Sequence, residues 1–533
     1  MRKFWSGALI GFLLTMELVA ISYSAYAIAS LPFLPFNLFD WQTRVLPGTV
    51  LAGGINVIVS TIRWLGIGNV SGTAKLGEQS FAVIEFLIGG VAVGAMFFIL
   101  ANIFRWKRPI LAGLLTGGVV ALAVLSISHS VEATGGVHSL GSGFWVAILC
   151  IVWGWALGWA FRQAVRSPTA DLRAVRAQQP VASRRLILAL SGSAVTIAAA
   201  GAALGRVAGN RRRTVRPSEQ PWSALNPLPN ANAAVQPVPG TRPEFTPLAQ
   251  HYRIDINAIP PQIDEASWRL RISGLVEQPL VWTIDDIRSQ PPLNQFITLS
   301  CISNFISGDL IGTQRWTGAS LKPLLPQMRL RSNATHLKIR SADGFYELVA
   351  LETIRADDRV MLTYAWDGLP LAAKHGFPLR IYIPDRYGMK QPKWIESIEA
   401  IDRREPGYWV IRGWDREAIM KATSAIDTIE SNMMIGAPNT QMGVPMGGFA
   451  HAGVRGISKV EVRVDDRPWQ QAELRTPLSG QTWVIWRYDW PREKGKHTFT
   501  VRCFEGDGTP QIEQDAPPDP SGATGLNTRK AMF

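Results

Sequence analysis

Cysteine is scarce in this chain of 533 residues, which contains only Cys150, Cys301 and Cys503. So sparse and odd a set excludes a disulfide framework and zinc sites built from paired cysteines. Covalently attached haem is also excluded, because no C-x-x-C-H motif occurs. Cys150 lies in an apolar run and Cys503 in an alternating strand pattern, which are usual settings of buried, inert cysteines. Only Cys301 follows a predicted strand and precedes a polar turn, where its sulfur could face a ligand.

Acidic residues are few in the first 205 positions, although the remainder of the chain has an ordinary mixture of charges. The formal net charge is +13. Combined with long apolar runs, this distribution is typical of membrane topology rather than of nucleic-acid binding. The sequence has no helix-turn-helix, zinc-finger or RNP-like motif and no basic stripe interleaved with aromatics. We therefore expect a membrane, and no nucleic acid, among the partners.

Four apolar segments are long enough to cross about 30 Å of hydrocarbon. They comprise residues 5–27, 81–104, 110–127 and 144–161, and a milder fifth segment comprises residues 186–204. Residues 50–66 are interrupted by Asn56, Arg63 and several glycines, so this segment is expected to lie at the membrane interface. The histidines nearest to the spans, His129 and His138, lie in or beside a polar loop, which argues against a transmembrane haem.

Lys and Arg residues cluster before the first span, after the second, and between the fourth and the fifth. Positive flanks stay in the cytoplasm, so everything after the fifth span is expected outside. Ser183, Arg184 and Arg185 precede that span, a pattern typical of a twin-arginine export signal; an ordinary anchor with positive flanks is the alternative. We therefore expect a membrane domain of about four transmembrane helices at residues 1–182 and a twin-arginine-like anchor helix at residues 183–205.

The second half of the chain has the pattern of soluble domains. Residues 206–245 are rich in Pro, Asn, Ala and Arg without periodicity, which predicts a linker. Residues 246–419 mix short β-like runs such as "WRLRISGL", "HLKIRSA" and "LRIYIP" with brief helical patterns such as "SLKPLLPQM", which predicts an α+β domain. Residues 420–533 contain the alternating runs "KVEVRVDD", "WVIWRYDW" and "HTFTVRCF", which predict a β-sandwich.

Three separated motifs of the α+β region occur in an order that makes a resemblance specific. They are "HYRIDINAIPPQIDEASWRLRISGLVEQPL" from His251, "LSCISN" with the following "RWTGASLKPLL", and "HGFPLRIYIPDRYGMKQPKW" from His375. Residues 246–419 thereby resemble the sulfite oxidase family of molybdopterin enzymes, particularly its membrane-anchored bacterial branch. The tail resembles the immunoglobulin-like sandwich of that family. The implied fold is an α-helical membrane domain, an α+β molybdopterin domain and an Ig-like β-sandwich, in that order.

The resemblance implies a metal ligand and a set of cofactor contacts. Cys301 matches the cysteine whose thiolate binds molybdenum, a role suited to a soft anionic sulfur beside a metal of high oxidation state. The cofactor carries a phosphate and a polar pterin, which need cations and directional donors. The positions that match the family's cofactor contacts are Tyr252, Arg253, Asp343, His375, Arg380, Gly388, Met389 and Lys390.

The substrate side departs from the animal and plant pattern. Trp414 occupies the position that matches a substrate-side tyrosine, and Tyr408 is close but offset. Loss of that hydroxyl removes a donor to an oxyanion, which counts against sulfite as the substrate. Arg253, Arg315 and Arg455 are the candidates for substrate-binding arginines. We therefore name Cys301, Trp414 and Arg253 as the candidate catalytic residues.

The predicted activity is oxygen-atom transfer to or from a small-molecule substrate by a molybdenum oxidoreductase anchored in the bacterial inner membrane, with its catalytic domains on the periplasmic or extracellular side. No haem or iron–sulfur motif is present, so a separate cytochrome or membrane redox protein is expected to exchange electrons. An S-oxide or N-oxide reductase, acting for example on methionine sulfoxide, is one alternative. A membrane-anchored partner-binding protein that has lost the metal is another. Sulfite oxidases often pair through the sandwich, so a homodimer is a further prediction.

Overall fold

The computed structural model describes residues 2–29, 31–47, 70–132, 140–166, 220–430 and 443–533, together with isolated residues between 50 and 61 and between 196 and 203. The chain divides into two compact units. Unit 1 comprises Met1–Leu46, Lys75–Pro217 and Ile256–Ile259. Unit 2 comprises Pro47–Ala74, Ser218–Asp255 and Pro260–Phe533. Each unit is described separately below.

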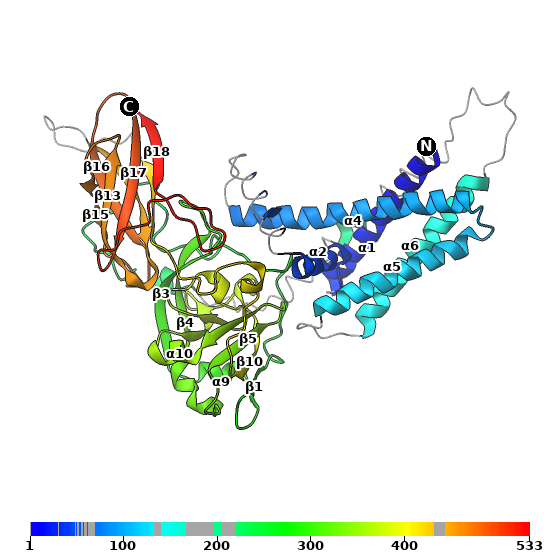
Figure 1. Ribbon diagram of the computed structural model, residues 1–533, viewed down its shortest axis with the longest axis horizontal. Coiled ribbons are helices and arrows are strands. Elements are labelled where there is room, and N and C mark those ends of the chain that lie inside the picture. The colour runs from blue at the N-terminus through cyan, green and yellow to red at the C-terminus, as the bar shows by residue number, and fades with distance from the viewer. Residues whose placement is uncertain are drawn as a thin grey trace. The chain divides into compact units, whose positions relative to one another are not determined.

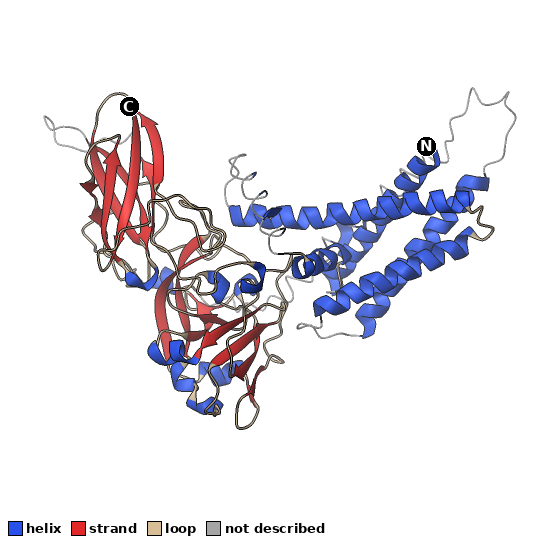
Figure 2. Cartoon of the chain, viewed as in Figure 1, coloured by secondary structure: helices blue, strands red, loops and turns tan. Residues whose placement is uncertain are grey.

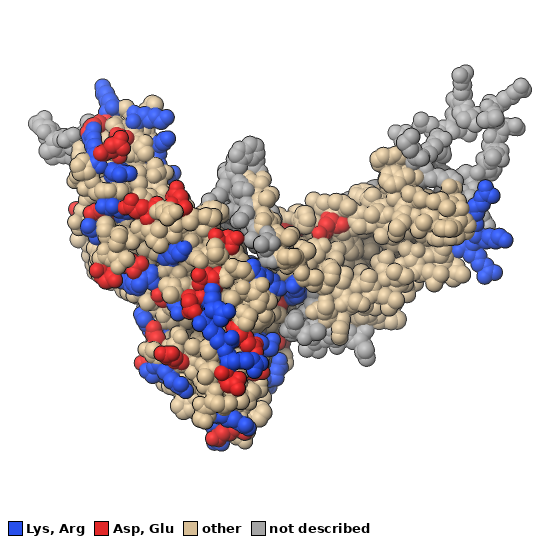
Figure 3. All heavy atoms as spheres, viewed as in Figure 1, with Lys and Arg blue, Asp and Glu red and all other residues tan. Residues whose placement is uncertain are grey.

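Unit 1 is built from helices, which Figure 1 shows in blue and cyan. They are α1 (Arg2–Ala29), α2 (Leu34–Val45), α4 (Val70–Ile103), α5 (Pro109–Glu132) and α6 (Leu140–Arg166). All except α2 contain a segment long and apolar enough to cross a membrane, and these candidate spans are Phe4–Ala29, Lys75–Ile103, Pro109–Ser130 and Gly141–Gln163. Large apolar side chains are exposed along them, and Figure 3 shows few charges over this surface. Such a surface suits lipid better than water.

Glycines allow the apolar helices to approach closely in pairs. A Cβ atom added at Gly11 of α1 would collide with the carbonyl of Gly90 in α4, and one at Gly113 of α5 would collide with the carbonyl of Gly154 in α6. Small residues at such crossings let the two backbones pack closely. Close packing matters in a bilayer, because apolar helices gain no hydrophobic free energy by exchanging lipid contacts for contacts with each other. Trp153 donates a buried hydrogen bond of 3.1 Å to the Thr15 hydroxyl, which joins α6 to α1.

Several predictions for the first half fall largely or wholly outside the described residues. These are the fifth apolar segment, the double arginine before it, the interfacial segment at residues 50–66, and His138. His129 is described and lies in the last turn of α5. The remaining four apolar segments each form a helix, as predicted; three of the helices extend beyond both predicted limits, whereas α4 begins earlier than predicted and ends at Ile103, one residue before the predicted end.

The first part of unit 2 contains two mixed or antiparallel sheets with short helices, drawn in green and yellow in Figure 1. One sheet has the order β2-β1-β10-β5-β6, in which β1 pairs with β10 in parallel. The other has the order β3-β4-β7-β8, with β9 paired to β7. The elements are β1 (Leu270–Gly274), β2 (Leu280–Trp282), α9 (Ile284–Arg288), β3 (Pro292–Ser300), β4 (Ile311–Ser320), β5 (His336–Ser341), β6 (Tyr346–Ala350), α10 (Leu351–Ala356), β7 (Met361–Trp366), β8 (Leu369–Pro370), β9 (Arg380–Tyr382) and β10 (Ile395–Ile401).

Both sheets contribute to one hydrophobic core. Ile339 and Ile398 come from the first sheet, whereas Leu362 and Ile381 come from the second, and all four are buried in the same cluster. The predicted strand runs "WRLRISGL", "HLKIRSA" and "LRIYIP" become β1, β5 and β9. The predicted helical run "SLKPLLPQM" forms two short 3-10 turns, because its two prolines lack the backbone donors that a longer helix needs.

The C-terminal part of unit 2 consists of two further antiparallel sheets, which Figure 2 shows as two sets of strands. Their orders are β11-β12-β16-β15 and β14-β13-β17-β18, and one core of buried residues joins them, with Val444 and Trp486 from the first and Val460 and Phe499 from the second. The predicted strand runs become β13, β16 and β17. The classification of these two sheets as an immunoglobulin-like sandwich stays a prediction. The strands are β11 (Thr423–Ile429), β12 (Gly443–His451), β13 (Ile457–Val464), β14 (Gln470–Gln471), β15 (Glu473–Leu474), β16 (Val484–Pro491), β17 (Lys496–Glu505) and β18 (Asn527–Met532).

The described part of the predicted linker, from residue 220, makes specific contacts within unit 2. It contains the short helix α8 (Trp222–Leu225), and Ser223 donates a 2.6 Å hydrogen bond to Asp367. Glu244 and Arg475 form a buried ion pair at 3.0 Å. The low-periodicity composition of this segment therefore corresponds to an irregular but packed chain.

Candidate active site

Cys301 directly follows β3, at the strand-to-loop position predicted for it. Its amide donates a 2.9 Å hydrogen bond to the Leu310 carbonyl, which extends the pairing of β3 with β4 by one residue. Asn304 closes the loop, because its side chain accepts a 3.0 Å hydrogen bond from the Leu310 amide. The Cys301 sulfur is buried and lies 2.9 Å from the Ser303 hydroxyl. The sheet thus fixes the backbone on both sides of the thiol.

The Cys301 thiol shares a hydrophobic cluster with Tyr252 and with the aromatic residues Trp316, Trp366 and Tyr382. Burial raises the pKa of the Cys301 thiol, and the hydrogen bonds with Ser303 offset part of that rise. Burial likewise raises the pKa of Tyr252 well above its ordinary value, and the nearby Cys301 contributes to this rise. Both groups are therefore protonated near neutrality in the absence of a bound cation. A metal ion at this sulfur would have to displace the thiol proton.

Arg380, at the start of β9, carries a buried charge that no carboxylate neutralises. Its side chain is 3% exposed, and within the described part of the chain no Asp or Glu lies within 4.0 Å of its guanidinium nitrogens. One nitrogen donates to the His375 carbonyl at 3.1 Å, whereas Nε has no partner. Burial lowers the pKa of Arg380 to about 10, so it remains charged at neutral pH. A buried cation without a counter-ion costs several kcal/mol, which predicts an anionic ligand here.

Aromatic rings surround the Arg380 charge. The guanidinium carbon lies 4.7 Å from the Trp316 ring centroid and 5.1 Å from that of Trp366. His375 packs against Trp366 with ring centroids 4.7 Å apart, and His251 lies 4.6 Å from the same ring. Cation–π contacts stabilise the buried charge without supplying a hydrogen-bond acceptor. The guanidinium therefore keeps donor capacity for a bound group.

His375 and His251 are both buried and their rings lie 5.5 Å apart. Burial lowers the pKa of His251 to about 3, and burial also lowers the pKa of His375, with the neighbouring His251 adding to the effect. Both imidazoles are therefore neutral at physiological pH. The Nε2 atom of His375 has no hydrogen-bond partner among the described residues, although buried polar atoms in folded proteins are nearly always paired. This atom is available to a polar ligand.

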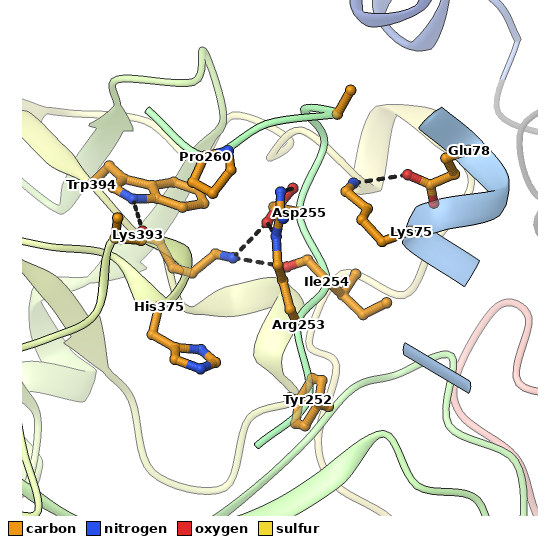
Figure 4. Close-up of polar contacts among 12 residues, drawn as sticks. Lys75, Glu78, Tyr252, Arg253, Ile254, Asp255, Pro260, His375, Lys393 and Trp394 are labelled. Atoms are coloured by element: carbon orange, nitrogen blue, oxygen red, sulfur yellow. Dashed lines mark hydrogen bonds and ion pairs between the residues drawn. The ribbon is translucent and has the colours of Figure 1, made fainter. Parts of the chain in front are cut away.

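A second group of charges joins the loop before β1 to Lys393, which lies just before β10, as Figure 4 shows. Asp255 accepts from Arg253 at 2.6 Å and from Lys393 at 3.3 Å, and Lys393 also donates to the Ile254 carbonyl at 3.0 Å. Burial lowers the pKa of Lys393 to about 8, and Asp255 opposes this shift. One carboxylate thus faces two cations, so the group is positive overall while Lys393 is protonated.

The 3-10 turn η4 (Gly388–Lys390) lies beside the cysteine loop and the Tyr252 hydroxyl. A Cβ atom at Gly388 would lie 3.0 Å from the Tyr252 oxygen and 3.5 Å from the Ser300 carbonyl, which explains a glycine at this close approach. Met389 is buried in a cluster with Ile302, the residue after Cys301. Lys390 forms a buried ion pair of 2.6 Å with Glu347.

Residues 257–409 match the family model described as "oxidoreductase molybdopterin binding domain". Sulfite oxidase of Arabidopsis thaliana is 26% identical over 284 residues, which cover 45% of this chain and 72% of that protein. Residues 257–409 therefore form a molybdopterin-binding oxidoreductase domain of the sulfite oxidase type. A second relative, from Azospira oryzae, is named provisionally as the protein-methionine-sulfoxide reductase subunit YedZ1 and is 29% identical over 154 residues. That match covers 29% of this chain and 56% of the relative, so the chain spans about half the length of that protein.

Among solved structures, the sulfane dehydrogenase SoxCD from Paracoccus pantotrophus is similar, with a TM-score of 0.49 and 18% sequence identity. The match covers 60% of this chain and 92% of that chain.

The molybdopterin cofactor of this family fits the residues at the site. An unpaired buried guanidinium suits an anionic group, and the unpartnered Nε2 of His375 suits a polar heterocycle. Cys301 and Tyr252 lie in one cluster, Gly388 lies against Tyr252, and Arg253 and Asp343 both act on the pKa of Lys393. Asp343 is buried and accepts a 3.0 Å hydrogen bond from the Phe345 amide. The tertiary structure therefore brings most of the predicted cofactor-binding residues of this sulfite oxidase relative into one region.

The predicted substrate-side residues lie in different surroundings. Trp414 packs partly buried against the cluster that contains Ile302 and Met389. Arg253 pairs with Asp255, Arg315 lies over the Trp222 ring at 4.9 Å, and Arg455 pairs with Asp385 and Glu505. The three candidate arginines thus already have partners. Tyr408 is buried beneath the Arg412 guanidinium, which lies 3.6 Å from its ring centroid.

Sequence reasoning missed three features of the site. Lys393 lies within the quoted "KQPKW" run, and its position one residue before the buried Trp394 was the available signal. His251, at the start of one quoted motif, was not among the predicted site residues, although it is buried beside His375. Trp316 and Trp366, which surround Arg380, come from two strands far apart in sequence, so no local pattern indicated their meeting.

Proposed function

We propose that this chain is a membrane-anchored molybdopterin oxidoreductase that transfers an oxygen atom between water and a small-molecule substrate outside the cytoplasmic membrane. The observation that carries the proposal is the buried Arg380 guanidinium without a counter-ion, in the same domain as the buried thiol of Cys301. The candidate spans of unit 1 support membrane anchoring. The positive flanks of the apolar segments support the outward orientation of unit 2.

In this proposal Cys301 is the metal ligand, and Tyr252, Arg253, Asp343, His375, Arg380, Gly388, Met389 and Lys390 hold the cofactor. Arg380 and Lys393 supply positive charge to its phosphate, while the neutral His375 offers Nε2 as donor or acceptor. Trp414 and Arg253 are the proposed substrate-side residues. The ion pair with Glu347 makes Lys390 the weakest of these assignments on electrostatic grounds, because its charge is already neutralised.

When bound, the molybdopterin supplies two-electron oxygen-atom transfer chemistry. The protein's own residues prepare for it. Cys301 must lose its proton to ligate a metal, and the Ser303 hydroxyl 2.9 Å away can then donate to the resulting thiolate. Tyr252 stays protonated and keeps a second anion away from the thiolate. The tryptophans around Arg380 exclude water from the buried charge, which strengthens its attraction for an anion.

Electrons are proposed to leave or arrive through a separate cytochrome or membrane redox protein. Three cysteines cannot hold a four-cysteine iron–sulfur cluster, and the sequence lacks a covalent haem motif. The C-terminal sheets are proposed to form an immunoglobulin-like sandwich. A homodimer that pairs through this sandwich is part of the same hypothesis.

A second candidate function is reduction of an S-oxide or N-oxide, for example an oxidised methionine. The provisional name of the Azospira relative refers to a methionine-sulfoxide reductase subunit, and the tryptophan at position 414 removes the hydroxyl expected near an oxyanion. A non-enzymatic membrane protein that has lost the metal is the remaining alternative.

Metal analysis separates the enzyme from the non-enzymatic alternative. The full chain, purified from a host that makes the cofactor, is expected to contain close to one molybdenum per chain. The reason is that the site offers a thiol ligand for the metal and an unneutralised positive charge for the anionic cofactor. Elemental analysis of the purified protein measures this content. Molybdenum far below stoichiometry, with normal content in a sulfite oxidase made in parallel, would contradict the proposal.

Direction and orientation are tested in intact spheroplasts. Ferricyanide does not cross membranes, so sulfite- or S-organic-dependent reduction of external ferricyanide requires an outward-facing site. Oxidation of reduced viologen by methionine sulfoxide instead would favour the second candidate. Activity only after the membrane is permeabilised would contradict the outward orientation.

Retention of the cofactor should depend on pH through Lys393. Its pKa of about 8 means that the amine is charged below that pH and neutral above it. A bound anion favours the charged form, so affinity for the cofactor should fall as pH rises from about 7 to 9.5. The measurement is the rate at which pterin fluorescence appears in solution during dialysis at each pH. In Lys393→Arg, which stays charged, this pH dependence should disappear; an unchanged dependence would mean that another group is responsible.

A further inference from the structure

A pocket of about 310 Å³, counting space open to solvent, lies within unit 2 where the molybdopterin domain meets the C-terminal sheets. We call it the junction pocket. Ser300, Asn304 and Phe305 border it from the cysteine loop, and Lys421 and His451 border it from the C-terminal side. Its enclosed part holds only about 20 Å³, enough for a small polar group, and the remaining space opens to solvent. Since Ser300 precedes Cys301, the pocket adjoins the proposed metal ligand.

His451, the last residue of β12, is a buried polar side chain close to the Thr482 backbone. It is 2% exposed, and among the described residues neither ring nitrogen has a hydrogen-bond partner of good geometry. Burial lowers its pKa to about 3, so the ring is neutral and offers one donor and one acceptor. A buried imidazole that borders a pocket with at least one nitrogen unsatisfied indicates a ligand that completes it.

Two further donors border the same pocket. The Tyr387 hydroxyl accepts a 3.2 Å hydrogen bond from the Lys421 amide, which leaves its own proton to donate. Burial raises the pKa of Tyr387 to about 12, so that proton is retained. The Lys421 ammonium donates to the Gly522 carbonyl at 3.0 Å, and no carboxylate of the described residues lies within 4.0 Å of it. Its remaining donors and its charge are available to an anion.

The rest of the lining is apolar or neutral. Phe305, Ile306 and Met420 supply hydrocarbon surface, and no Asp or Glu of the described residues borders the pocket. Arg455 fixes this wall, because it pairs with Glu505 at 2.6 Å and with Asp385 and donates to the Met420 carbonyl. The pocket thus combines one cation, several neutral hydrogen-bonding groups that include Tyr387 and His451, and an apolar side.

We propose that the junction pocket binds a small organic sulfinate, with its oxyanion at Lys421, Tyr387 and His451 and its alkyl group against Phe305, Ile306 and Met420. The proposal rests on the oxygen-atom transfer activity proposed above. The reaction is R–SO₂⁻ + H₂O → R–SO₃⁻ + 2 H⁺ + 2 e⁻. A sulfur–oxygen bond forms at the sulfur lone pair, water loses both protons, and the two electrons pass through the cofactor to an electron acceptor.

A sulfinate suits the charge, two of the hydrogen-bonding groups and the apolar side of the lining together. Its single negative charge matches one available cation, and its two oxygens can accept from Tyr387 and His451. Inorganic sulfite would leave the apolar side unfilled. A neutral sulfoxide would leave the Lys421 charge without a counter-ion. A sulfinate also has a lone pair on its sulfur, at which the new sulfur–oxygen bond can form.

The test uses the full detergent-solubilised chain and 1-propanesulfonate, which has the shape and charge of the expected product. Isothermal titration should show saturable binding that is about tenfold tighter than that of methanesulfonate, since two more CH₂ groups are buried. Lys421→Met should weaken the binding of 1-propanesulfonate at least tenfold by removing the charge, whereas Lys421→Arg should retain most of it. His451→Leu should also weaken it, by about fivefold or more.

Lys494→Met is the matched control, because Lys494 is exposed and lies outside the pocket. The affinity of this variant for 1-propanesulfonate should equal that of the wild type. Unchanged affinity in Lys421→Met, or no saturable binding to the wild type, would overturn the proposal. Protein made without the cofactor should still bind 1-propanesulfonate, so a failure of the proposed enzymatic function appears in the molybdenum content and not in this titration. With the metal present, propanesulfinate should reduce two ferricyanide ions per molecule; oxidation of sulfite but not of propanesulfinate would also overturn the proposal.

Discussion

Cys301→Ser should lower turnover by roughly 10³-fold or more, which corresponds to about 4 kcal/mol of activation free energy. The physical reason is that a hydroxyl is a poor substitute for a soft anionic sulfur at molybdenum. The fold should persist, because the backbone of residue 301 is held by its pairing with Leu310 and not by the side chain. X-ray absorption at the molybdenum edge should show one sulfur ligand fewer than in the wild type.

Cys503→Ser is the control for this experiment. Cys503 is equally buried, but it lies in the core of the C-terminal sheets and its sulfur donates to Gln511 at 3.2 Å. A serine can make the same bond, so the variant should lose about 1 kcal/mol of stability and keep its turnover and its sulfur count at the metal. Wild-type turnover in Cys301→Ser, or the same loss in both variants, would show that Cys301 is not the ligand.

Arg380→Met should have opposite effects on the cofactor-free protein and on cofactor binding. Without a bound anion, the buried guanidinium is an uncompensated charge, so its removal should stabilise the protein by about 1–3 kcal/mol. The melting temperature of cofactor-free protein should rise by about 2–4 °C per kcal/mol. Cofactor content after purification should fall at least tenfold, because the variant lacks the charge that the anionic group requires.

Arg271→Met is the matched control in the same domain. Arg271 lies on β1 with a side chain that is 62% exposed, 3.8 Å from Glu396, so its removal should change neither melting temperature nor cofactor content appreciably. Destabilisation of cofactor-free Arg380→Met would mean that the tryptophan contacts stabilise the guanidinium more than burial penalises it. In that case the unpaired charge could not be taken as a sign of a missing anion.

Arg380→Met is expected to raise the stability of the cofactor-free protein and to lower cofactor binding, and this opposition reflects a general property of the site. Arg380, Lys393 and Lys374 all have pKa values lowered by burial, whereas Asp255 is the carboxylate that pairs with Lys393. The protein therefore stores unfavourable charge that an anionic cofactor relieves. Preorganisation of this kind costs stability in the free protein and returns it as affinity when the ligand binds.

Some features of this protein follow from the sequence by itself. Apolar length identifies the four candidate spans, and alternation identifies β13, β16 and β17, because both signals are local and repeat along the chain. The strand-to-loop position of Cys301 and the three motifs identify the family for the same reason. The structure confirms these elements, whereas the individual cofactor contacts and the orientation in the membrane stay predictions.

Other features were decided only by the tertiary structure. The meeting of Trp316, Trp366 and Arg380, the unpaired state of that arginine, the depressed pKa of Lys393, and the junction pocket with His451 all depend on segments that are distant in sequence. Burial and hydrogen-bond partners are properties of the packed chain, and the same histidine or arginine letter is compatible with an exposed or a buried side chain. For that reason the sequence determined which chemistry this chain belongs to, and the packing determined where its charges and unsatisfied donors are available to a ligand.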